Sequence, residues 1–73
     1  MIPTPDEIKK LINIANDSEF SSGMRIQAIK TIGNIGNREA LLALLELVAN
    51  ESLIKKEREL ALKCVQDIVK SGP

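Results

Sequence analysis

Histidine is absent from this sequence, and aromatic residues are nearly so. The 73 residues include no Trp or Tyr, and Phe20 is the only aromatic residue. Without histidine the chain lacks the commonest general base and metal ligand. The single cysteine, Cys64, excludes an intramolecular disulfide framework, and no clustered Cys or His predicts a metal site. We therefore expect no catalytic activity, no metal and no cofactor.

The sequence also has no excess of positive or negative charge. Lys and Arg together number 10, as do Asp and Glu, so the formal net charge is zero. Such a chain has no long-range attraction for nucleic acid or an anionic membrane. The longest apolar stretch, residues 40–49, contains Glu46 and is too short to span a bilayer. The first ten residues do not resemble a signal peptide. We expect a cytoplasmic protein that binds neither nucleic acid nor a membrane.

Ile, Leu, Val and Ala recur at helical spacing in four segments, and no segment alternates with the period of a strand. The pattern predicts one all-α domain over residues 1–73, with helices over 4–16, 22–35, 38–49 and 56–70. Thr4 and Glu7 are spaced as in a capping box, which favours a helix start there.

The same pattern predicts how these segments pack. The third is apolar nearly all round, which indicates a central position. Phe20, in the first loop, is expected to fold back over the first helix pair. The inward side of the fourth segment should consist of Ala61, Leu62, Val65 and Ile68. A solvated side with i,i+4 pairing is expected from Glu57, Glu59, Lys63 and Asp67.

The chain aligns with itself, without a gap, in the register that places Thr4 on Asn37. Both of these residues are suited to cap a helix. The pairs of residues that are identical in this register include Arg25 and Arg58, Ala28 and Ala61, and Lys30 and Lys63. We predict two antiparallel helix hairpins that repeat, over residues 4–36 and about 37–70.

Residues 24–36 resemble the second helix of a HEAT repeat. The pattern is most similar to the short HEAT-like repeats of bacteria and archaea first associated with phycobilin lyases. That family favours an apolar residue before Arg, an Ala three residues later, and two glycines near the helix end. The matching residues here are Arg25, Ala28, Gly33 and Gly36. The resemblance implies that the helix hairpins stack as a short right-handed α-solenoid.

The second copy departs from this pattern, because Glu57 precedes Arg58 and because Gln66 and Val69 replace the two glycines. This departure weakens the expectation that a further repeat stacks on the C-terminal side.

The resemblance also assigns structural roles. Ala28 and Ala61 would allow close helix approach, as would Gly33, and Gly36 suits a left-handed helix end. Asp17 resembles an acidic turn residue that reaches toward the following Arg25.

At the equivalent positions in the second copy, Asn50 and Arg58 would form a hydrogen-bonded pair. The alternative is that both arginines are simply exposed. Cys64 is expected to be a small buried thiol. Residues 33–36 read G-x-x-G, which we interpret as a helix end and not as a nucleotide or nucleic-acid motif.

Second helices of successive repeats commonly line a binding surface. The outward positions there are Gln27, Lys30, Asn34, Lys63, Asp67 and Lys70. We expect a protein-interaction module with a polar surface for an acidic peptide, although ordinary solubilising lysines would give the same pattern. The alternatives are a relative of phycobilin lyases that handles a bilin and, with less support, a module that binds nucleic-acid backbones.

Repeat arrays usually need about three units to bury a continuous core, and this chain has two. The shortfall predicts another protein as partner, or a homo-oligomer formed through an uncovered apolar end. The candidate end residues are Leu60 and Val69, and Met24, Ile14 and Ile26.

Overall fold

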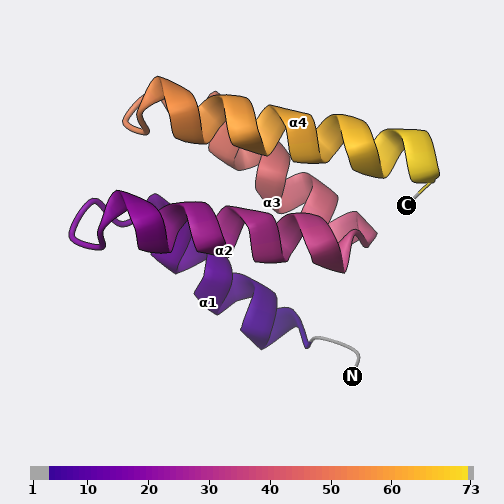
Figure 1. Ribbon diagram of the computed structural model, residues 1–73. Coiled ribbons are helices and arrows are strands. Elements are labelled where there is room, and N and C mark those ends of the chain that lie inside the picture. The colour runs from indigo at the N-terminus through magenta and orange to yellow at the C-terminus, as the bar shows by residue number, and fades with distance from the viewer. Residues whose placement is uncertain (1–3, 73) are drawn as a thin grey trace.

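The computed structural model describes residues 4–72, except for the side chain of Pro5. In this part of the chain the fold is all-helical, as predicted, and contains no strand. Figure 1 shows the helices α1 (Pro5–Asn16), α2 (Ser22–Ile35), α3 (Arg38–Ala49) and α4 (Lys55–Ser71). The predicted and observed helix ends differ by at most one residue.

Polar side chains at the caps explain why most of these boundaries were predictable. Each of three N-caps accepts a hydrogen bond from a backbone N–H three residues on, which satisfies one of the free donors of the first turn. The caps are Thr4 (3.2 Å from the Glu7 nitrogen), Ser21 (3.2 Å from that of Met24) and Asn37 (2.8 Å from that of Ala40). The fourth N-cap, Ile54, makes no side-chain hydrogen bond.

Gly36 ends α2 as predicted. Its φ of 64° lies in the left-handed region, which glycine enters without a Cβ penalty. Its N–H donates to the Ile32 carbonyl. The next residue, Asn37, already caps α3, so the connection between the two hairpins is very short.

The helices form two antiparallel pairs placed side by side. In Figure 1, α1 and α3 lie on one side and α2 and α4 on the other, and α2 and α4 run in the same direction. The pairs α1–α2 and α3–α4 are in contact, and so are α2–α4, α2–α3 and α1–α3. Helix α3 therefore touches all three other helices, and so does α2.

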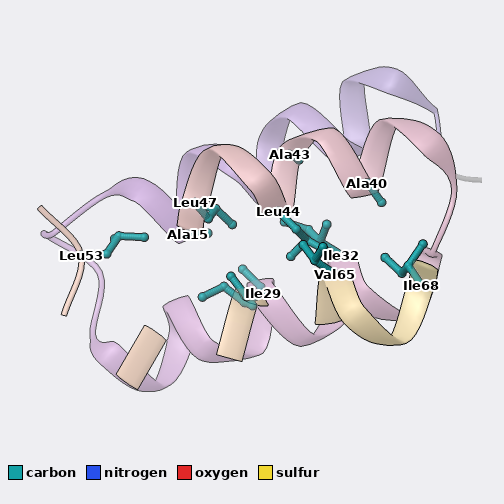
Figure 2. Close-up of a cluster of buried hydrophobic side chains, with 12 residues drawn as sticks. Ala15, Ile29, Ile32, Ala40, Ala43, Leu44, Leu47, Leu53, Val65 and Ile68 are labelled. Atoms are coloured by element: carbon teal, nitrogen blue, oxygen red, sulfur yellow. The ribbon is translucent and has the colours of Figure 1, made fainter. Parts of the chain in front are cut away.

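The core lies between the hairpins. Figure 2 shows Ile29 and Ile32 of α2, Leu44 of α3 and Val65 of α4 pointing toward one another. The buried core cluster consists of Ala15, Ala28, Ile29, Ile32, Ala40, Ala43, Leu44, Leu47, Leu53, Ala61, Val65 and Ile68. Because all of these side chains are aliphatic, helix packing here needs no aromatic residue.

Two predictions about packing need correction. Leu62 was expected to point inward, yet it is 43 % exposed, because no described part of the chain covers that side of α4. Helix α3 contacts every other helix but is not covered on all sides, since Leu42 and Leu45 are exposed.

The two loop residues at equivalent repeat positions differ in burial. Leu53 belongs to the core cluster, whereas Phe20 is only half-buried and does not belong to it.

Candidate functional site

A buried ion pair joins the two hairpins. Glu57 lies in the first turn of α4 and its side chain is fully buried, while the side chain of Arg25 on α2 is 12 % exposed. Arg25 Nε donates to Glu57 Oε1 at 3.0 Å, and Arg25 NH2 donates to Oε2 at 3.1 Å. Ser22 Oγ also donates to Oε2, at 2.8 Å. The prediction that Glu57 belongs to a solvated side of α4 is therefore wrong.

Arg25 also holds the loop between α1 and α2. Its NH1 donates to the backbone carbonyls of Asp17 (3.4 Å), Ser18 (3.3 Å) and Phe20. The expected pair of Asp17 and Arg25 side chains does not form, and the Asp17 carboxylate instead accepts from the Glu19 N–H at 2.9 Å. The guanidinium group thus connects the loop of the first hairpin to the buried acid of the second.

The electrostatics favour the ionised form of Glu57. Burial acts to raise the pKa of Glu57, but the hydrogen bonds from Arg25 and Ser22, together with the Arg25 charge, lower it by more. The net effect is a pKa below the ordinary glutamate value. Glu57 raises the pKa of Arg25 mainly through their hydrogen bond. The pair is consequently fully charged at neutral pH and is placed to hold the hairpins together.

Arg58, the counterpart of Arg25, has different partners. Its Nε donates to the Val48 carbonyl at 3.0 Å, at the C-terminal end of α3. The expected Asn50–Arg58 pair does not form, and Asn50 Oδ1 instead accepts from Ser52 N at 3.0 Å and from Ser52 Oγ at 2.6 Å. Asn50 Nδ2 donates to Asn16 Oδ1 at 2.8 Å. The alternative of plain exposure is also wrong, because both arginines are partly buried.

Small residues allow close approach at the contact of α2 with α4. Ala28 and Ala61 are both buried, as expected of closely packed helices. A Cβ atom on Gly33 would lie 2.7 Å from the Cys64 Sγ and 3.1 Å from its Cβ, so Gly33 makes room for Cys64. Cys64 is half-buried, and burial raises the pKa of its thiol, as does nearby Asp67. Cys64 is thus less buried than expected, and its raised pKa disfavours the thiolate.

All six predicted surface residues are exposed, but only some gather in one place. Asn34 of α2 and Asp67 of α4 line one hollow between the two helices. Lys30 and Lys63 both lie close enough to Cys64 for their charges to lower the pKa of its thiol. They therefore lie along the contact between α2 and α4.

Of the other two, Gln27 lies apart from these four. Gln27 instead lines a hollow between α1 and α2, with Leu11, Ile14 and Met24 among its neighbours. Lys70 lies in the last turn of α4. The expected Glu59–Lys63 and Lys63–Asp67 pairs do not form, and the ion pair on this helix is Lys55–Glu59.

Among residues 4–72, no set of three or more His, Cys, Asp or Glu side chains could hold a metal ion. None of the helices described is long and apolar enough to cross a membrane. No buried side-chain nitrogen or oxygen among the described residues lacks a hydrogen-bond partner.

No protein-family model, curated protein or solved structure gives a significant match to this chain.

Proposed function

We propose that this chain is a non-catalytic, HEAT-like protein-interaction module, built as a short α-solenoid of two repeats. The side-by-side placement of α2 and α4 carries this proposal. Figure 1 shows that the two helices run side by side in the same direction. This placement brings the exposed residues Lys30 and Asn34 of the first hairpin beside Lys63 and Asp67 of the second. Second helices that align in this way form the binding surface of many repeat proteins.

Hydrogen bonds that recur at equivalent positions of the two hairpins support the repeat. In the first loop the Phe20 N–H donates to the Asp17 carbonyl, and in the second the Leu53 N–H donates to that of Asn50, both at 3.2 Å. The side chains of Asp17 and Asn50 each accept a hydrogen bond from the N–H two residues on. Two loops of different sequence thus share one backbone geometry, as expected for repeats that span residues 4–36 and about 37–70.

The charges along the α2–α4 surface favour an acidic partner segment. Lys30 and Lys63 outnumber the single carboxylate of Asp67, and Lys70 adds a further positive charge toward the end of α4. Because these side chains are exposed, we expect them to act chiefly on association rate and specificity and less on raw affinity. The partner we propose is an acidic peptide segment of another protein.

Affinity capture with charge-reversed variants tests this function. Intact chain with Lys30→Glu and Lys63→Glu is compared with wild type as bait in an extract of the cells that encode it. The matched control reverses two exposed lysines of α1, Lys9→Glu and Lys10→Glu. We expect a protein captured by wild type and control to be lost with the α2–α4 variant. The same set of proteins on all three baits would contradict the proposal.

A further inference from the structure

The second hairpin exposes positions that are buried in the first. Ile29 is fully buried, whereas Leu62, its counterpart in the repeat register, is 43 % exposed. Ala15 is likewise buried, whereas its counterpart Val48 is half-buried. The first hairpin is covered by the second, and no described residue covers the second hairpin in the same way. The uncovered side of the α3–α4 hairpin is here termed its free side. It corresponds to the side of the first hairpin that packs against α4.

Arg58 lies on this free side with most of its hydrogen-bonding capacity unused. In the first hairpin, Arg25 directs Nε and NH2 to the Glu57 carboxylate. Arg58 uses Nε for the Val48 carbonyl, and among the described residues its NH1 and NH2 have no acceptor. A single hollow, here termed the C-terminal end surface, is lined by Val48, Lys55, Arg58, Glu59 and Leu62.

We propose that the C-terminal end surface binds a helix of another protein, which presents a carboxylate to Arg58 as Glu57 does to Arg25. Lys55 and Glu59 form an exposed pair at 3.8 Å, which leaves the charge of Arg58 unmatched and favours an anionic group. Val48 and Leu62 supply apolar area beside it. This inference rests on the proposed role as an interaction module but assigns a second surface, separate from the α2–α4 lysines.

A second copy of the chain does not supply this carboxylate. If the first hairpin of another copy stacked here as the second hairpin stacks on the first, Met24 would occupy the place of Glu57. Glu7 and Lys10 would then replace two buried alanines of α3, Ala40 and Ala43, at the contact. These polar groups oppose close packing and disfavour a second copy stacked in this way.

The contact is limited to the half of α4 that contains Arg58. At the contact of α2 with α4, Gly33 leaves room for the Cys64 side chain. The equivalent residue of α4 in the repeat register is the larger Gln66. Val69 likewise replaces Gly36. Larger side chains at these two positions keep a third helix away from the C-terminal half of α4. The bound helix therefore diverges from α4 beyond Leu62.

An NMR titration of the intact, ¹⁵N-labelled chain tests the proposal. The probe is a peptide with the sequence of residues 55–71 in which Cys64 is replaced by serine, because it contains Glu57 in its native helical context. At peptide concentrations up to about 1 mM, where even weak complexes are populated, we expect shifts centred on Val48, Arg58 and Leu62. No shifts, or shifts centred on Met24 and Gln27, would overturn the proposal.

Two substitutions show whether the carboxylate and the guanidinium group meet. Glu57→Gln in the peptide, or Arg58→Gln in the protein, should each weaken binding about tenfold, and the two together no more than either alone. Arg38→Gln, which removes an exposed arginine at the start of α3, is the matched control and should leave binding unchanged. Equal binding by the Arg58→Gln protein would contradict the assignment.

Light scattering distinguishes a foreign partner from a second copy. We expect a monomer at the concentrations of the titration, and a dimer that Leu62→Ser dissociates would overturn the proposal. Because Lys30 and Lys63 are unchanged in all these variants, failure of the titration leaves the capture experiment on the α2–α4 surface independent.

Discussion

Glu57 and Arg25 meet across the boundary of the two hairpins, with Arg25 Nε 3.0 Å from Glu57 Oε1. The acid is completely buried and the base is nearly so. Removing one member of such a pair leaves a charge without its partner, which is more costly than removing both. The contact also fixes the stacking register, because Arg25 simultaneously holds three carbonyls of the α1–α2 loop.

The stability contributed by Glu57 should disappear in acid. Its pKa is lowered in the folded state relative to about 4.3 in the unfolded chain, so its contribution is complete above that pH and is lost as the pH falls through the folded value. We expect Glu57→Gln to lower the free energy of unfolding by about 2 kcal/mol at neutral pH. Urea unfolding followed by circular dichroism should show this difference shrinking toward zero as the pH falls to about 2. A difference that stays constant across this range would refute the lowered pKa.

Gly33→Ala should destabilise the protein despite the better helix propensity of alanine. The added Cβ would lie 2.7 Å from Cys64 Sγ, and we expect the cost of overpacking to exceed the propensity gain by about 1 kcal/mol. Cys64→Ala should recover part of the loss, since it removes the sulfur but not the Cβ at 3.1 Å.

Gly23→Ala is the matched control for that experiment, because the new Cβ at this position of α2 meets only Ser21 Oγ, at 3.9 Å. It should be neutral or stabilising. Thermal unfolding curves check both expectations for wild type, Gly33→Ala, Gly33→Ala with Cys64→Ala, and Gly23→Ala. A stabilising Gly33→Ala would show that α2 and α4 are farther apart than described.

Ile54→Ser should stabilise α4. Ile54 is the N-cap, is about half exposed and makes no side-chain cap hydrogen bond, whereas its counterpart Ser21 accepts one from the Met24 N–H. The Glu57 N–H donates to the Ile54 carbonyl at 3.1 Å, and a serine hydroxyl in the same place gives it a second acceptor. We expect a gain of at most about 1 kcal/mol in the free energy of unfolding. Denaturant titration measures this gain. Ile54→Ala, which supplies no acceptor, controls for the loss of the exposed isoleucine, and an equal effect of the two substitutions would exclude capping as the cause.

Helix positions were predictable from the sequence because local chemistry determines them. Thr4 and Asn37 cap helices with their own side chains, and Gly36 ends one with a positive φ. These interactions span only a few residues and are visible in the order of the chain. The recurrence of the caps in one ungapped register also indicated the two hairpins before any packing was known.

The buried acid was not predictable from spacing on α4 alone. Glu57 precedes Arg58 and lies near Lys55 and Glu59, a pattern typical of a solvated helix face. The useful signal was the self-alignment, in which Glu57 falls on the apolar Met24. A charged residue in an apolar repeat position suggests a specific partner, but only the packing of α4 on α2 identifies Arg25.

Leu62 illustrates a second limit. It falls on the buried Ile29 in the repeat register, and the amphipathic pattern of α4 predicts that it faces inward. Its exposure depends on whether another hairpin follows, which is a property of the stack and not of the helix. The same reasoning explains why Arg58 and Arg25 differ in partners although their sequence positions are equivalent.

A double-mutant cycle on Arg25 and Glu57 tests most directly whether this ion pair joins the two hairpins. Arg25→Met, Glu57→Leu and the combined variant are compared with wild type by urea unfolding at neutral pH. We predict that each single substitution lowers the unfolding midpoint and that the double variant loses less than the sum of the two single losses, because two apolar side chains of similar size can replace a buried pair. The hydrogen bonds from Arg25 to the loop carbonyls are lost in both Arg25 variants and are not recovered. Losses that simply add in the double variant would contradict the account.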